Sequence, residues 1–179
     1  MPAWNNTPLT VYHGTDDVSS GRPGIRQGTV LRGFAVNLSI CRPFTDFGRG
    51  FYTTTSLHQA REWANARVRR IVSPTQTHTA MVIEFHLDRD WLASLETLAF
   101  ARPIVDFWNL VTDCRNGFPP HQRPGSKPTY DVVYGPVTIW PSRLLIQDCD
   151  QISFHTTGAA AGLRRPVVTQ VAPAGGLFP

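Results

Sequence analysis

The sequence predicts an α+β fold, and three observations support this prediction. Only two stretches show a helical periodicity of apolar residues, at 57–70 and 104–116. Strands and helices do not alternate regularly, as they would in a doubly wound parallel sheet. The β-prone runs are short and bounded by turn residues; they are Leu9–Tyr12, Phe51–Thr55, Thr79–Leu87, Tyr130–Tyr134 and Gln151–His155. We expect Leu144–Asp150 to form a short helix or turn before the last run.

Length and composition predict one globular domain. The 179 residues are 41% hydrophobic and 17% charged, which is typical of a chain that buries a core. The sequence contains no internal repeat and no linker to a second domain. We therefore expect a single domain over residues 1–156. Residues 157–179 contain GAAAG, APAGG and several prolines, which predicts a flexible C-terminal tail with little to bury.

Several classes of protein are disfavoured. No apolar run approaches the roughly 18–20 residues that span a bilayer, so we expect no membrane segment. The opening MPAWNNTPLTVY lacks the basic flank and apolar core of a signal peptide, which favours a cytoplasmic protein. Three widely spaced cysteines without a CxxC pair predict reduced thiols. No histidine has metal-ligand spacing with Cys, Asp or Glu, so we predict no metal site.

The segment Thr45–Ala64, TDFGRGFYTTTSLHQAREWA, predicts a turn, a short strand and a helix in succession. Ser56 is the expected N-cap, because its hydroxyl can accept a hydrogen bond from a backbone N–H of the first helical turn. The apolar positions of the helix recur at helical spacing and predict one buried stripe; they are Leu57, Ala60, Trp63 and Ala64.

Two aromatic residues of this segment leave two interpretations open. Tyr52 lies on the predicted strand and Trp63, eleven residues later, on the helix. If strand and helix pack together, the two rings face each other across a slot. Such a slot suits a flat cationic ring, because an aromatic face attracts a cation. Ordinary core packing of both rings is the alternative.

Five motifs follow one another in a fixed order. They are YHGT at 12–15, DFGRGFY at 46–52, QAREWA at 59–64, YDVVYGPV at 130–137 and QISFHT at 151–156. In this order the chain resembles the ADP-ribosyltransferase superfamily, in the branch of diphtheria toxin and the poly-ADP-ribose polymerases. It resembles more closely a bacterial family of uncharacterised domains in that superfamily. The resemblance covers about residues 9–156 and implies a split antiparallel β-sheet core with a few flanking helices.

The resemblance implies an activity and its partners. The chain is expected to be a mono-ADP-ribosyltransferase, an enzyme of the glycosyltransferase class that uses NAD as co-substrate. ADP-ribose would pass to a macromolecular acceptor, either protein or nucleic acid, and nicotinamide would leave. A role as a bacterial toxin or effector is also implied, with a neutralising partner protein and delivery into a target-cell cytoplasm. The net charge of +4 permits a nucleic-acid acceptor without identifying one.

Carried onto this sequence, the resemblance implies catalytic roles for His13, Tyr52 and Gln151. His13 is expected to hydrogen-bond a hydroxyl of the ribose next to nicotinamide, and the backbone of Gly14 to hold the carboxamide. Tyr52 is expected to stack on nicotinamide, with Trp63 on its other face. The residues implied to contact NAD are His13, Gly14, Thr15, Arg49, Gly50, Phe51, Tyr52, Thr53 and Trp63.

One position departs from the best-known members of the superfamily. No glutamate follows Glu96, so Gln151 occupies the late-strand position of the catalytic glutamate. A glutamine can hydrogen-bond the ribose 2′-OH, but it cannot act as a base or carry a compensating charge. This favours transfer of a single ADP-ribose, and it leaves open a catalytically silent NAD or ADP-ribose-binding module and an NAD glycohydrolase. Two further alternatives stay open. Gln151 could be no more than the start of a strand, and Arg49 could be a solvent-facing side chain rather than a pyrophosphate ligand.

Overall fold

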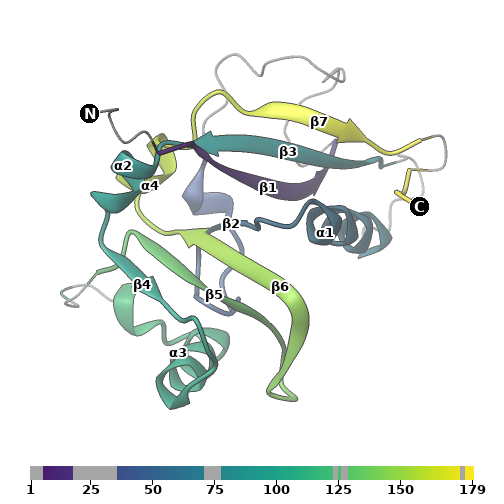
Figure 1. The fold of residues 1–179 in the computed structure, drawn as a ribbon. Helices are drawn as coiled ribbons and strands as arrows, with labels where there is room; N and C mark the ends of the chain where they lie inside the picture. Colours follow the sequence, from purple (N-terminus) through teal and green to yellow (C-terminus); the bar gives the residue numbers. More distant parts are fainter. Residues whose placement is uncertain (1–5, 18–35, 71–77, 123–124, 126–128, 174–175) are drawn as a thin grey trace. The chain divides into compact units, whose positions relative to one another are not determined.

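The computed structural model describes residues 6–17, 36–70, 78–122, 125, 129–173 and 176–179, which form two compact units (Figure 1). Unit 1 takes its described residues from Met1–Phe34, Thr53–Asp88 and Leu163–Pro179, and unit 2 from Ala35–Tyr52 and Arg89–Gly162. The mixed content of strands and helices confirms the α+β prediction. In chain order the elements are β1 (Leu9–Asp16), the 3-10 helix η1 (Leu38–Ile40), β2 (Phe51–Thr53), α1 (Leu57–Arg70), β3 (Ala80–Leu87), α2 (Arg89–Ala93), β4 (Thr97–Ala99), α3 (Val105–Arg115), the 3-10 helix η2 (Pro120–Gln122), β5 (Val132–Ile139), β6 (Leu144–Phe154), α4 (Thr157–Ala161) and β7 (Val167–Val171).

Unit 1 is a three-stranded antiparallel sheet on which α1 packs. The strand order is β1-β3-β7, and β1 pairs with β3 along its whole length, from Leu9 opposite Leu87 to Asp16 opposite Ala80. Small side chains between helix and sheet let the two backbones approach closely. The buried residues of this interface are Ala60, Ala64, Ala80, Val82, Ala172 and Phe178.

Unit 2 is a four-stranded sheet with the order β2-β6-β5-β4. β5 and β6 are antiparallel, whereas β4 runs parallel to β5. The second sheet is therefore mixed, and the expectation of a purely antiparallel core is wrong at β4. The apolar face of α3 supplies much of the core of this unit, whose buried residues are Phe47, Phe100, Phe107, Leu110, Val111, Cys114 and Val133.

The predicted central helix is confirmed together with its cap. α1 begins at Leu57, and the Ser56 hydroxyl accepts a hydrogen bond from the Gln59 N–H at 3.2 Å. Of the four stripe positions, Ala60 and Ala64 are fully buried and the other two are half-buried. Helical periodicity and a capping residue therefore located this element correctly.

The prediction of a flexible tail at 157–179 is wrong for the described residues of that segment. α4 is capped by the Thr156 hydroxyl, which accepts from the Ala159 N–H at 3.2 Å. β7 pairs with β3 inside the unit 1 sheet, where Val168 is fully buried, and Phe178 packs with α1. Composition could not show that this segment is buried, because the partners that cover it lie far away in the chain.

The expectation of a helix or turn at Leu144–Asp150 is also wrong. These residues form the first part of β6, which pairs with β5 from Leu144 opposite Ile139 onwards. Pairing with a neighbouring strand overrides local preference here, as strand formation commonly depends on its context.

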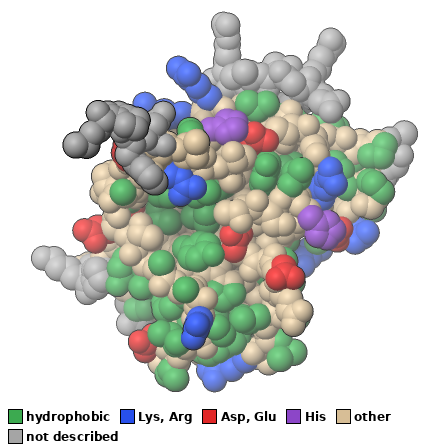
Figure 2. Space-filling model, in the orientation of Figure 1, with side chains coloured by type: hydrophobic (Ala, Val, Ile, Leu, Met, Phe, Trp, Pro, Cys, Tyr) green, Lys and Arg blue, Asp and Glu red, His purple; other side chains and the backbone are tan. Residues whose placement is uncertain are grey.

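Large apolar side chains are exposed on unit 2. Figure 2 shows hydrophobic side chains gathered in the lower part of the view, where Figure 1 draws α3, β5 and β6. The exposed large hydrophobic residues include Phe44, Ile104, Val105, Phe118, Ile139 and Leu144. None of the described helices combines the length and the apolar character that crossing a membrane requires.

Candidate functional site

The motif His13-Gly14-Thr15 lies on β1, at the edge of the unit 1 sheet. β3 pairs with one side of β1, and a bridge to Thr54 occupies the other side. The Tyr12 N–H donates to the Thr54 carbonyl at 2.8 Å, and the Thr54 N–H donates to the Tyr12 carbonyl at 2.9 Å. In antiparallel pairing, the backbone groups of successive residues point to opposite edges of a strand. Gly14, two residues after Tyr12, therefore directs its N–H and C=O to the edge away from β3.

Gly14 lies against the backbone of α1. A Cβ atom at this position would lie 2.0 Å from the carbonyl oxygen of Ala60 and 2.8 Å from the nitrogen of Ala64. Two residues further along β1, the Asp16 carboxylate accepts from the Arg67 Nε at 2.5 Å. α1 therefore runs in the same direction as β1. Its turn 60–64 lies at the level of Gly14, and the close approach requires the missing Cβ.

Trp63 lies on the side of α1 that faces the edge described above. Gln59, one turn earlier, accepts at 3.0 Å from the hydroxyl of Thr54, the residue that bridges this edge. On the opposite side of the helix, Arg61 donates to a glutamine of β7 at 2.5 Å. Residues four apart share one helix face. Trp63, half-buried, therefore projects on the Gln59 side at the level of Gly14.

His13 and Thr15 face away from α1. Side chains alternate between the two faces of a strand, and Gly14 faces the helix. His13 is half-buried and pairs in register with Ile83 of β3, whereas Thr15 is buried. The imidazole of His13 therefore lies on the face of β1 that points away from α1. The indole of Trp63 lies beside the same edge of β1, but on the side of α1.

We expect Gly14→Ala to lower the free energy of unfolding by about 1–3 kcal/mol, because the added methyl overlaps backbone atoms that no rotamer change can move. Urea unfolding of both proteins measures the difference. Gly158→Ala is the matched control, since its nearest neighbouring atom lies 4.0 Å from the added Cβ. Equal stability of Gly14→Ala and the unmodified protein would contradict the close contact.

In unit 2, the Tyr52 hydroxyl closes the turn that precedes its strand. It accepts from the Phe47 N–H at 2.9 Å and donates to the Gly48 carbonyl at 2.9 Å, and the Thr45 hydroxyl lies 2.7 Å away. The Tyr52 ring stacks on Phe47 with centroids 6.4 Å apart. Burial raises the pKa of Tyr52, so the phenol stays neutral. Tyr52 therefore holds the Thr45–Gly48 turn, and its stacking on nicotinamide stays a prediction.

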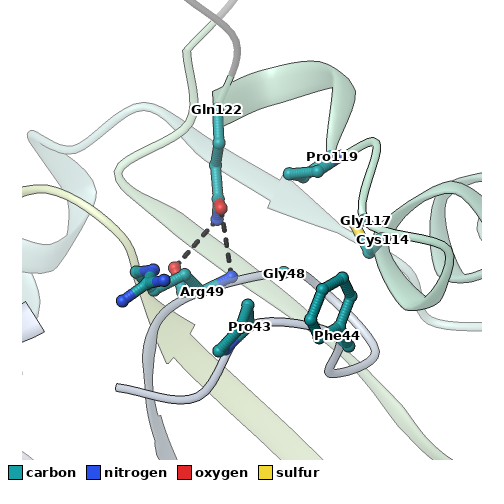
Figure 3. A pocket seen from close by; sticks show the side chains of 8 residues that line it. All are labelled: Pro43, Phe44, Gly48, Arg49, Cys114, Gly117, Pro119 and Gln122. Atoms are coloured by element: carbon teal, nitrogen blue, oxygen red, sulfur yellow. Dashed lines mark hydrogen bonds between the residues drawn. The ribbon is translucent and has the colours of Figure 1, made fainter. Parts of the chain in front are cut away.

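Gln122 fixes the next part of the same loop (Figure 3). Its Oε1 accepts from the Arg49 N–H at 3.0 Å, and its Nε2 donates to the Arg49 carbonyl at 2.9 Å. Gly48 has a φ of 79°, in the region that favours glycine. A Cβ at Gly50 would lie 2.8 Å from the His155 ring. The two glycines of the motif are therefore explained by backbone conformation and packing.

A cavity of about 160 Å³ lies beside this loop (Figure 3). Ligand pockets commonly measure about 300–1,000 Å³, so this cavity is too small for a dinucleotide. Arg49 is exposed at its rim, and its guanidinium donates to the Ser39 carbonyl at 2.7 Å. The residues that line the cavity are Pro43, Phe44, Gly48, Arg49, Cys114, Gly117, Pro119 and Gln122.

Two histidines of unit 2 lie behind the loop. The rings of His121 and His155 meet edge to face, with centroids 4.8 Å apart. His155 Nδ1 lies 2.9 Å from the Arg49 carbonyl, and its Nε2 lies 2.7 Å from the Ser153 hydroxyl. Burial lowers the pKa of both histidines to about 4, and the neighbouring His121 lowers that of His155 further. Both rings are therefore neutral near pH 7.

Gln151 lies in the interior of β6, so the alternative in which it merely begins a strand is wrong. Its Nε2 donates to Asp46 Oδ2 at 2.7 Å and to the Pro136 carbonyl at 3.0 Å. The buried Asp46 also accepts from Arg115, through Nε at 2.8 Å and Nη2 at 2.6 Å. Thr138 adds its N–H at 3.1 Å and its hydroxyl at 2.7 Å. Both carboxylate oxygens are therefore engaged, which leaves Asp46 unsuited to act as a base or nucleophile.

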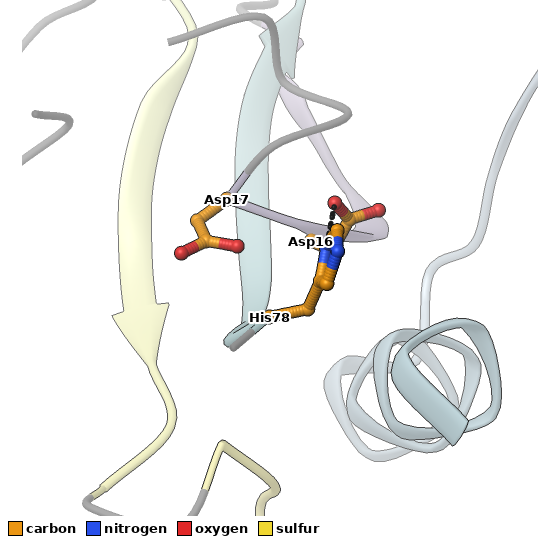
Figure 4. A group of neighbouring side chains, drawn as sticks. All are labelled: Asp16, Asp17 and His78. Atoms are coloured by element: carbon orange, nitrogen blue, oxygen red, sulfur yellow. Dashed lines mark hydrogen bonds and ion pairs between the residues drawn. The ribbon is translucent and has the colours of Figure 1, made fainter. Parts of the chain in front are cut away.

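Asp16, Asp17 and His78 form a cluster of titratable side chains in unit 1 (Figure 4). Asp16 is fully buried, and its oxygens lie 2.5 Å from Arg67 Nε and 3.4 Å from His78 Nδ1. Asp17 accepts from the Thr79 N–H at 3.0 Å. These contacts tie the end of β1 to α1 and to the start of β3, and we assign the cluster to that structural role.

The sequence-predicted residues thus fall into two groups. Unit 1 brings Gly14 and Trp63 together at the β1 edge. Unit 2 holds Tyr52 and Gln151 through the same Thr45–Gly48 turn. A slot between Tyr52 and Trp63, with His13 beside it, stays a prediction. The other residues implied to contact NAD are Thr15 and Thr53, both buried in unit 1, and in unit 2 the exposed Arg49, the buried Gly50 and the half-buried Phe51.

Sequence reasoning missed the residues that support these side chains. Asp46 belonged to a recognised motif, but its contact with Gln151 joins residues 105 positions apart. The other supporting residues are Arg115 on α3, Gln122 on η2, Thr138 on β5 and His155, which directly follows β6 and lies in the QISFHT motif. No spacing in the sequence marks their supporting roles, because each contact is made only when the chain folds.

Comparison with known proteins gives one finding. The family described as "Protein of unknown function (DUF3990)" matches residues 9–139. That span includes the first four motifs and ends before Gln151. No curated protein and no solved structure matches the chain.

Proposed function

The chain belongs to the family described as "Protein of unknown function (DUF3990)", and from the geometry of its own site we propose that it is a mono-ADP-ribosyltransferase. NAD is its co-substrate, and its acceptor is a macromolecule, either protein or nucleic acid. The division of the strands into two sheets supports an ADP-ribosyltransferase-like fold.

The edge of β1 carries the proposal. Gly14 directs one donor and one acceptor to the same edge, and a carboxamide offers the complementary acceptor and donor. Trp63 lies at the same level of the helix beside that edge. A ring held by its carboxamide at Gly14 can therefore lie against the indole. Because nicotinamide in NAD is cationic, the aromatic face adds electrostatic attraction to the contact.

The chemistry follows from this mode of binding. The bond between the nicotinamide nitrogen and C1′ of the ribose breaks, and its electron pair leaves with nicotinamide, which becomes neutral. A lone pair of the acceptor forms the new bond to C1′, and the acceptor releases its proton to solvent. The transition state has oxocarbenium character, as in glycoside hydrolysis. His13, on the same strand as Gly14, holds a ribose hydroxyl.

One observation favours a second candidate, a silent NAD or ADP-ribose-binding module. The carboxylate nearest to Gln151 belongs to Asp46, and both of its oxygens are engaged by hydrogen-bond donors. Without a carboxylate facing the developing charge, binding without turnover is the expected behaviour of such a site. An NAD glycohydrolase differs from the transferase only in using water as the acceptor.

Nicotinamide release from NAD tests the proposal. We expect His13→Ala and Trp63→Ala each to lower the rate by on the order of 100-fold, the cost of losing one preorganised contact. Trp63→Phe keeps an aromatic face and is expected to recover most of the rate, with an elevated KM. His86→Ala, at an exposed position of β3 in the same sheet, is the control. Thermal unfolding of every variant checks that the fold is retained.

Each outcome has a defined meaning. Undiminished release in both His13→Ala and Trp63→Ala removes the assignment. Binding of NAD by calorimetry without any release supports the silent module. Labelled NAD added to a lysate separates the remaining two activities, because a labelled macromolecule appears only with a transferase.

A further inference from the structure

The Gln151 side chain is held in one orientation. Its Nε2 donates both to Asp46 Oδ2 at 2.7 Å and to the Pro136 carbonyl at 3.0 Å. A carboxylate and a carbonyl oxygen are both acceptors, so only the NH₂ side of the amide fits between them. The amide is therefore oriented by its surroundings, with Oε1 on the side away from Asp46.

Gln151 is buried, at 4% exposed, but its Oε1 keeps its capacity to accept a hydrogen bond. Within the described part of the chain, no group donates a hydrogen bond to this oxygen, and the one enclosed side-chain atom without a partner is His121 Nδ1. Oε1 thus has no donor among the described residues, although the side chain that carries it is largely enclosed. An amide whose N–H groups donate to a carboxylate is also polarised, which strengthens its oxygen as an acceptor.

We propose that Asp46 is a positioning residue: it holds the Gln151 amide so that Oε1 accepts a hydrogen bond from a ribose hydroxyl of NAD, and it excludes a charged carboxylate from position 151. This inference rests on the proposed function for the identity of the ligand. It also accounts for the glutamine at this position, because a glutamate there would place two carboxylates in direct contact.

The charges around position 151 support this account. Asp46 is the acidic group in contact, and Arg115 is bound to the other oxygen of Asp46, its Oδ1. Burial raises the pKa of Cys114, near Asp46, to about 12 and also raises that of Tyr52, so both are neutral. Asp150 precedes Gln151 on β6 and points to the opposite face of the sheet. Among the described residues, a carboxyl group introduced at position 151 therefore contacts the negative charge of Asp46. It contacts no positive charge that lacks a partner.

The variant Gln151→Glu tests the inference. When protonated, the introduced carboxylic acid can donate to Asp46 and present its carbonyl oxygen as the amide does. We expect its pKa to lie at least about two units above the usual 4.3 of a glutamate, because the like charge of Asp46 disfavours ionisation. ¹³C-labelled glutamate makes this measurable by NMR, since the chain has only three other glutamates, Glu62, Glu84 and Glu96.

Nicotinamide release supplies the second readout. We expect the rate of Gln151→Glu relative to the unmodified protein to be near one at pH 5.5 and to fall at least about tenfold by pH 8. The loss should follow the pKa measured by NMR. Gln147→Glu, at an exposed position on the same strand, is the matched control and should keep a constant ratio. If Gln151 had only a structural role, the rate ratio would not follow the titration of the carboxyl group introduced at position 151.

The outcomes separate the two proposals. A carboxyl pKa near 4.3 at position 151 overturns the positioning role of Asp46. A raised pKa with full activity of Gln151→Glu at pH 8 overturns the role of Oε1 as the required acceptor. If the unmodified protein releases no nicotinamide, the proposed function fails and the ligand assigned to Oε1 falls with it, whereas the NMR titration still decides whether Asp46 excludes a charge.

Discussion

Asp46→Ala is expected to lower the free energy of unfolding by about 3 kcal/mol, the lower end of the cost of breaking a buried ion pair, because the Asp46 carboxylate is buried whereas the Arg115 side chain is 27% exposed. Asp46 is 2% exposed and accepts hydrogen bonds from three side chains and one backbone N–H. Its removal takes one acceptor from the guanidinium of Arg115 and from the polar groups of Thr138 and Gln151. Urea unfolding at pH 7 measures the loss.

Asp113→Ala is the matched control for this prediction. Asp113 is exposed on α3, two residues before Arg115, so its removal changes the net charge equally without touching the buried network. We expect its effect to remain within about 0.5 kcal/mol, as for most surface substitutions. A double-mutant cycle with Arg115→Met isolates the pair itself. A loss at Asp46 no larger than that at Asp113 would show that the network contributes little.

Acidification is expected to destabilise the fold between about pH 6.5 and pH 4. His121 and His155 have a pKa of about 4 in the folded chain, because burial disfavours their charged forms. In the unfolded chain a histidine has a pKa of about 6.5. The unfolded state therefore binds more protons in this interval, and stability falls as the pH falls. The contribution of the two histidines to the free energy of unfolding is complete above pH 6.5 and is lost by pH 4. For the pair it totals a few kcal/mol.

Urea unfolding at several pH values between 7 and 4.5 measures this slope. His155→Asn keeps an amide that can donate to the Arg49 carbonyl and removes one titrating group. We expect it to flatten the dependence of stability on pH, even if it lowers stability at pH 7. His58→Asn, at an exposed position of α1, is the control. An unchanged slope in His155→Asn would place the acid sensitivity elsewhere in the chain.

Local signals in the sequence located the elements that stabilise themselves. The Ser56 cap and the apolar stripe identified α1, and apolar periodicity identified α3 to within one residue at each end. β3 was equally clear, because a nearly unbroken run of apolar residues extends to Leu87. These predictions succeeded because capping and periodicity involve residues within one or two turns of each other.

Elements that depend on a distant partner were predicted poorly. Leu144–Asp150 is a strand because it pairs with β5, and Val167–Val171 is a strand because it pairs with β3. Strand formation at such places is decided by the neighbouring strand, which composition cannot show.

The amino-acid sequence was sufficient to mark five candidate site residues, because five short motifs follow one another in a fixed order along the chain. These residues are His13, Gly14, Tyr52, Trp63 and Gln151. Folding decided what those residues do in the structure. Gly14 is a glycine because the backbone of α1 lies against it, and the Gln151 amide has a fixed orientation because Asp46, 105 residues away, accepts a hydrogen bond from its Nε2. Contacts over such separations form only when the chain closes on itself, so no local pattern encodes them.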